Sequence, residues 1–208
     1  MSVNEMNLLV GRENTALDNR VLGAIAMISA PMLLVFFMFG ETDPSVPKTL
    51  SGELMSLTGV LYIGGWMCGA VGMRRLRATG KGRASRIVFI VQMMLLSFAL
   101  LYSVMEVCGF SYENGGLIFA VADNGYPLSH LFMIWVGAFV WRAKAWNGAA
   151  KIAPLLVGAA LPVFFALSPF VGMKTAGFGF GALTAAGLGI IGYTIQKQSY
   201  RLIFASLV

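Results

Sequence analysis

Residues 87–108 read IVFIVQMMLLSFALLYSVMEVC, a run of 22 residues in which Glu106 is the single charged side chain. A helix of about 20 apolar residues is long enough to cross the roughly 30 Å hydrocarbon core of a bilayer. Lipid offers no hydrogen-bond partners, so the backbone of such a run has to be helical. The stretch therefore predicts a transmembrane helix.

Five further runs of the same kind surround it. The chain is 58% hydrophobic and 12% charged, whereas a soluble domain carries about 25% charged residues. A polar leader of 20 residues precedes the first run without a recognisable cleavage site, so we expect that run to be a retained helix. The sequence predicts an all-α, polytopic bundle in one domain (1–208), with six transmembrane helices at about 21–40, 53–73, 87–108, 126–141, 152–171 and 176–195.

Basic residues predict the orientation of the bundle. If the N-terminus is cytoplasmic, the inner segments hold 13 of the 15 Lys and Arg, and the outer loops hold only Lys48 and Lys174. This asymmetry is what the positive-inside rule requires. We therefore expect both termini in the cytoplasm and the chain in the plasma (inner) membrane. Six of the nine acids fall on the outer side, where they are solvated loop charges or attract cations.

One inner loop is especially basic. Six cations fall within 13 residues: Arg74, Arg75, Arg77, Lys81, Arg83 and Arg86. Such a cluster sets topology, and it can also contact anionic lipid headgroups on the cytoplasmic side at about 1 kcal/mol per side chain. We expect no specific binding of nucleic acid.

Glu106 and His130 are the main candidates for a site. Glu106 is the one acid inside an apolar run, and an ionisable group in a span is a functional candidate because desolvation is expensive. His130 is the only histidine and lies about one turn inside the outer end of the span predicted at 126–141. Consecutive antiparallel helices would put the two at one depth, where a Glu–His contact could bind a proton, a ligand or a metal. The simpler interpretations are a carboxylate that reaches the headgroups and a hydrogen-bonded histidine.

Other polar side chains would extend this site. Tyr102 lies one turn below Glu106 on the same helix face, and Tyr62, Glu53 and Ser129 could approach from neighbouring helices. The predicted ligand-binding pocket near the outer leaflet comprises Glu106, His130, Tyr102, Tyr62, Glu53 and Ser129. Tyr and Ser also occur as interface anchors and as hydrogen-bonding contacts between helices. One His and two Cys are too few for a His-rich metal centre, and no cofactor or catalytic residue is predicted.

Small residues predict close helix packing. Gly177, Gly181, Ala185 and Gly189 form a stripe at four-residue spacing, and Gly65 and Gly69 form a shorter one. Such stripes let helices approach closely, within the bundle or in a homo-oligomer or a complex with a partner membrane protein.

Three function classes follow from these features. The first is a transporter-like protein that binds or transports a small molecule, ion or lipid at the outer polar site. The second is a non-catalytic subunit of a membrane complex that packs through its Gly-rich last helix. The third, a membrane enzyme acting on a lipid with Glu106 and His130 as acid and base, is least favoured because no third catalytic group is identifiable.

Overall fold

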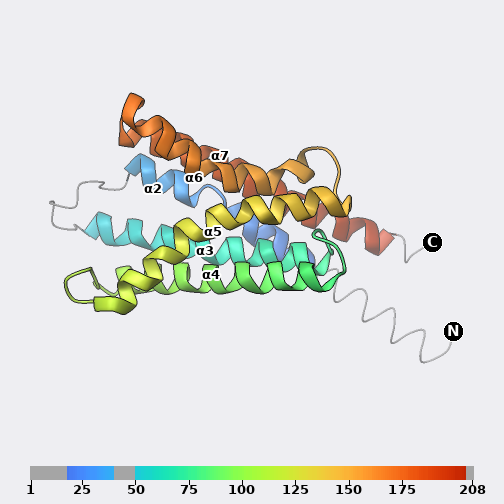
Figure 1. Cartoon of the computed structure of the whole chain (residues 1–208), viewed down its shortest axis with the longest axis horizontal. Helices are drawn as coiled ribbons and strands as arrows, with labels where there is room; N and C mark the ends of the chain where they lie inside the picture. The colour runs from blue at the N-terminus through green and yellow to red at the C-terminus, as the bar shows by residue number, and fades with distance from the viewer. Residues whose placement is uncertain (1–17, 40–49, 205–208) are drawn as a thin grey trace.

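The computed structural model of the chain describes residues 18–39 and 50–204, with side chains for 18–39 and 56–200. Every regular element in these ranges is a helix (Figure 1). They are a helix at Asp18–Phe39, which is interrupted at residues 30–31 and ends in α2 (Met32–Phe39), then α3 (Leu50–Arg75), α4 (Arg83–Val107), α5 (Gly116–Ala143), α6 (Ala149–Val171) and α7 (Met173–Phe204). The interruption falls at Pro31, which has no N–H to donate to the preceding turn.

The expected all-α architecture of membrane-length helices is confirmed. Among the described residues, five segments are long and apolar enough to cross a bilayer: Asp18–Phe39, Ser56–Arg75, Arg83–Val107, Ala149–Val171 and Met173–Tyr200. The sixth long helix, α5, has 28 residues but carries more polar side chains.

The fourth predicted helix was too short. It was expected at 126–141, yet α5 begins ten residues earlier, at Gly116. Asp123 and Asn124 lower the hydropathy here without breaking the helix, because the Asn124 amide donates back to the Ala120 carbonyl at 2.7 Å. The polar side chains therefore concealed nearly three turns of continuous helix from the hydropathy pattern.

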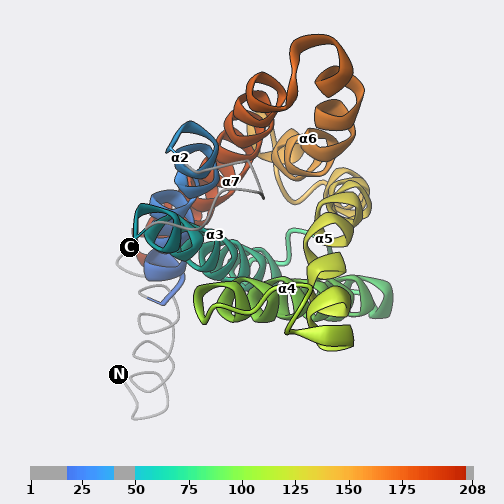
Figure 2. The same cartoon turned by 90° about the vertical axis from the view of Figure 1, so that its left-hand side faces the viewer.

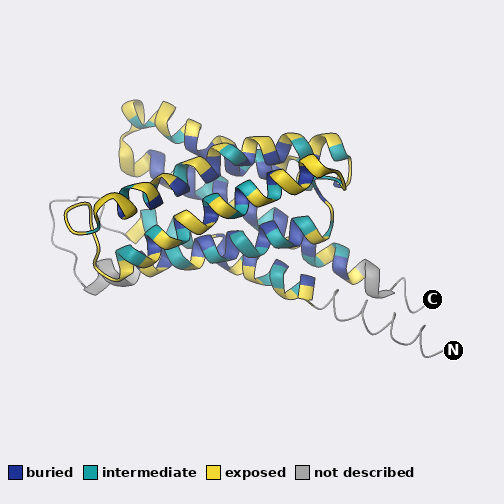
Figure 3. Cartoon of the chain, turned by 60° about the horizontal axis from the view of Figure 1, so that its bottom comes forward, coloured by how far each residue is buried: buried dark blue, intermediate teal, exposed yellow. Residues whose placement is uncertain are grey.

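The helices pack in chain order and close into a ring. Each helix from α2 to α7 contacts the next, and α7 returns to contact α2 and α3 (Figure 2). The inward faces are buried and the outward faces are exposed (Figure 3). The exposed faces are strongly apolar, with Leu117 at 80% and Phe170 at 84% exposure. Large apolar side chains in such numbers on the outside are typical of a surface that faces lipid or another protein.

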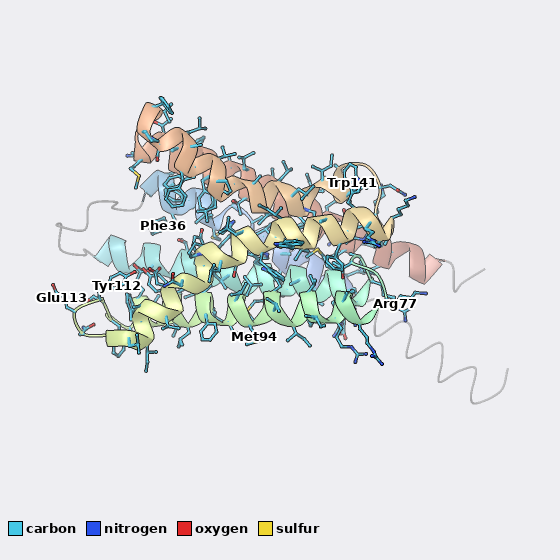
Figure 4. All side chains as sticks on the ribbon, in the orientation of Figure 1. Phe36, Arg77, Met94, Tyr112, Glu113 and Trp141 are labelled. Carbon is cyan, nitrogen blue, oxygen red and sulfur yellow. The ribbon has the colours of Figure 1, made fainter. Side chains whose placement is uncertain are left out.

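The two ends of the ring differ in charge. The described chain starts and finishes at the same end, where the α3–α4 and α5–α6 connections also lie (Figure 1). We call this the basic end, because its described side chains include Arg20, Arg74, Arg75, Arg77, Lys81, Arg83, Arg86, Arg142, Lys144, Lys151 and Lys197. Figure 4 shows Arg77 there, with Tyr112 and Glu113 at the opposite end.

Glycines set the closest contacts between helices. A β-carbon added at Gly192 of α7 would lie 2.6 Å from the Gly23 carbonyl oxygen, and one added at Gly181 would lie 2.8 Å from the α-carbon of Leu34. Within the predicted stripes, Gly177 faces the Phe37 ring, Gly65 faces Ser29, and Gly69 makes ordinary contacts with Ala26 and Ile191, whereas Gly189 faces open space. The first helix thus lies against α7 where neither has room for a side chain.

These contacts predict different outcomes for two glycines of α7. We expect Gly192→Ala to destabilise the protein by about 1–3 kcal/mol, because the new methyl group would meet rigid backbone. Gly189→Ala should be neutral or stabilising by up to about 1 kcal/mol, because alanine is the better helix former. Thermal unfolding in detergent micelles, followed by circular dichroism, measures both. Equal losses in the two variants would contradict the packing described.

Candidate functional site: a buried histidine cluster

His130 lies in the middle of α5 with its side chain fully buried. A β-carbon added at Gly125, one turn away, would lie 2.6 Å from the Ala99 backbone nitrogen, so α4 and α5 nearly touch at this level. This close approach directs the next turn of α5, which carries His130, towards the interior of the ring.

Both ring nitrogens of His130 have partners. Nδ1 lies 3.0 Å from the Val157 carbonyl oxygen in α6, and Nε2 lies 3.4 Å from the Tyr62 hydroxyl in α3. A carbonyl can only accept, so Nδ1 carries the proton. In the neutral ring Nε2 is then an acceptor, to which Tyr62 donates. The histidine therefore connects three helices through one fixed tautomer.

Aromatic rings enclose the imidazole. The centroid of the His130 ring is 4.7 Å from that of Trp66, 4.9 Å from that of Phe180 and 5.0 Å from that of Tyr126. The Tyr62 ring lies parallel to it at 6.5 Å. We call His130, Tyr62, Trp66, Tyr126, Phe180 and Thr184 the histidine cluster. It lies in the interior of the ring, where residues of α3, α5 and α7 meet and His130 contacts α6.

Two donors in the cluster have no partner among the described residues. They are the indole nitrogen of Trp66 and the hydroxyl of Tyr126, both buried. The Thr184 hydroxyl donates to the Phe180 carbonyl at 2.8 Å. An unpaired buried donor costs about 1–3 kcal/mol, so the cluster offers two unused hydrogen bonds to any acceptor that enters it.

Glu106 does not reach His130, contrary to the expectation of equal depth. Ala99 and Gly125 lie side by side. From that level Glu106 is seven residues towards the opposite end, and His130 is five residues towards the basic end. At 1.5 Å per residue the two are separated by about 18 Å along the helix axes. The early start of α5 is the reason, since it puts His130 mid-helix instead of one turn from an end.

Tyr102 belongs to a second group, near the opposite end. Its ring packs on Phe119 at 4.8 Å between centroids, and Tyr112 packs on the other side of Phe119 at 5.1 Å. Tyr112, in the α4–α5 connection, donates a hydrogen bond to the Asp123 carboxylate. That bond raises the pKa of the Tyr112 phenol to about 12. The predicted outer pocket is therefore divided between this group, in which Phe119 is buried and Tyr112 is exposed, and the histidine cluster.

The remaining predicted residues are Ser129, which is fully buried, and Glu53. The Ser129 hydroxyl donates to the Gly125 carbonyl at 2.7 Å, within its own helix. The side chain of Glu53 lies outside the described residues. Among the described residues, no three of His, Cys, Asp and Glu are grouped so that they could hold a metal ion.

Sequence reasoning found His130 and Tyr62 but missed Trp66, Tyr126, Phe180 and Thr184. The sequence does contain a pattern that points to these four residues. Three helices each contribute one pair spaced four residues apart, which lies on one helix face: Tyr62 with Trp66, Tyr126 with His130, and Phe180 with Thr184. Aromatic and polar residues at this spacing in apolar runs indicate inward faces.

Comparison with known proteins gives no relative. The sequence matches no protein-family model and no curated protein, and no solved structure matches the fold. The account of function therefore depends on the geometry alone.

The cluster predicts opposite effects for two tyrosines. Tyr62→Phe leaves His130 Nε2 without its donor, and we expect a loss of about 1–3 kcal/mol in the free energy of unfolding. Tyr126→Phe removes a hydroxyl that has no partner, so stability should be unchanged or higher. Unfolding of the purified protein by denaturant in mixed micelles compares the pair. If Tyr126→Phe is the more damaging change, the hydrogen bonds are assigned wrongly.

Proposed function

We propose that the chain is an integral membrane protein with six spans and with its basic end in the cytoplasm. The five long apolar helices support this proposal. The 28 residues of α5 would extend about 42 Å, and α5 packs along both α4 and α6. The concentration of Lys and Arg at one end supports the orientation through the positive-inside rule.

Labelling of one cysteine tests the orientation. Cys108 is exposed and directly follows α4 at the opposite end, while Cys68 is half-buried in α3. In a Cys68→Ala protein, a maleimide that cannot cross membranes should label Cys108 in intact cells. Labelling only after the cells are disrupted would show that the opposite end is cytoplasmic.

We propose further that the histidine cluster binds a small molecule that combines an apolar body with a hydrogen-bond acceptor. The single observation that carries this proposal is the pair of unpartnered donors, Trp66 Nε1 and Tyr126 Oη, buried beside an ordered imidazole. A ligand acceptor that pairs with these donors would remove their desolvation penalties. Ligand sites generally combine apolar walls with a few such polar groups.

The chemistry of the cluster selects among ligands. Both open groups can donate, so a carboxylate or carbonyl oxygen is matched to both, whereas an ammonium group finds no acceptor at Trp66 Nε1. The aromatic rings of Trp66, Tyr126 and Phe180 offer flat apolar surfaces for the body of the ligand. The proposed binding site therefore lies in the interior of the bundle and not near the outer leaflet. Glu106 takes no part in it.

Thermal unfolding with matched probes tests the binding proposal. Benzoate should raise the unfolding temperature of the purified protein, and benzylamine, of the same size but with a cationic donor, should not. Tyr126→Phe should lose most of the benzoate effect while keeping its basal stability. Ser129→Ala is the control, because that hydroxyl bonds within α5. Stabilisation by benzylamine, or an undiminished benzoate effect in Tyr126→Phe, would contradict the proposal.

A further inference from the structure

Arg74 differs from the other cations of the basic loop. Its guanidinium turns towards α4, where Nη1 donates to the Ser85 hydroxyl at 3.2 Å. Ser85 is held in place because it donates to the Gly80 carbonyl at 2.9 Å and contacts the Thr79 hydroxyl at 2.7 Å. Arg75, by contrast, pairs with Asp18 on the surface at 3.3 Å. Arg74 is therefore positioned by the fold, and among the described residues no carboxylate is paired with it.

A small cavity lies beside Arg74. Its volume is about 20 Å³, and it is lined from α3, the α3–α4 connection, α4 and α5 by Ala70, Met73, Arg74, Thr79, Val88, Phe89, Gln92 and Val136. A cavity needs about 10–15 Å³ to hold one water molecule. The space is thus large enough for a single water molecule or a monatomic ion.

Gln92 is the second polar group of this cavity. Its side chain is 2% exposed, and neither its amide nitrogen nor its amide oxygen has a hydrogen-bond partner. Gln92 lies in α4, nine residues from the start of the helix at Arg83. A buried amide with both atoms unpaired is unusual in native proteins and indicates a missing partner.

We propose that this cavity binds one halide anion, held between the Gln92 amide N–H group and the Arg74 guanidinium. The size of the cavity suits a monatomic guest, and the positive charge of Arg74 favours an anion over a cation. Arg74 has five N–H donors, of which the described hydrogen bond uses one. The neighbouring cations Arg77, Lys81 and Arg83 raise the local positive potential. The apolar walls suit chloride or bromide, which shed water more readily than small anions. This site is independent of the histidine cluster.

Unfolding temperatures in different salts test the site. At equal ionic strength, sodium chloride or bromide should raise the unfolding temperature of the purified protein above its value in sodium gluconate. The gluconate anion is too large for the cavity. A halide at about five times its dissociation constant should raise the unfolding temperature by roughly 2–4 °C.

Two variants test whether the halide shift in unfolding temperature arises at this cavity. Gln92→Leu should abolish the halide shift and should raise the unfolding temperature in gluconate, because it replaces an unpaired amide by an apolar side chain of similar size. Arg75→Gln, outside the cavity, should keep the shift. An equal shift in Gln92→Leu would place the halide elsewhere, and equal unfolding temperatures in chloride and gluconate would show that the cavity holds water only. Either result overturns the proposal.

Discussion

The hydrogen bond between His130 Nδ1 and the Val157 carbonyl is the interaction on which the interior of the bundle depends. A histidine buried among apolar helices must satisfy both ring nitrogens, because water is not there to do so. The α6 carbonyl fixes the proton on Nδ1 and turns Nε2 towards Tyr62. One side chain thereby sets the positions of α3 and α6 relative to α5. Phe180 of α7 packs on the same ring.

The exterior of the bundle differs from this polar interior site. Large apolar side chains are exposed over the ring, and charges gather at its ends. Glycines at positions such as Gly23 and Gly192 let backbones meet directly where no side chain fits. In lipid such close packing replaces the hydrophobic effect as a cause of helix association. The few polar groups inside, His130 and Gln92 among them, stand out because burying them is costly unless they are paired.

The helices could be predicted from the sequence because a run of about 20 apolar residues has only one stable form in a bilayer. The depth of the α5 residues in the bundle could not be predicted, because Asp123 and Asn124 are typical of the end of a span. In the structure they belong to a continuous helix. The sequence therefore predicted only part of this arrangement. Tyr62 and His130 do meet, but Glu106 lies about 18 Å from His130 along the helix axes. The partners of His130 come from helices far apart in sequence, which residue spacing alone does not bring together.

The tautomer of His130 is the most direct test of this account. The chain has one histidine, so nitrogen NMR of the protein labelled with ¹³C- and ¹⁵N-histidine, in lipid, needs no assignment between residues. The hydrogen bond to Val157 predicts a neutral ring at neutral pH with its proton on Nδ1 and a bare, hydrogen-bonded Nε2. A proton on Nε2, or on both nitrogens, would contradict the arrangement.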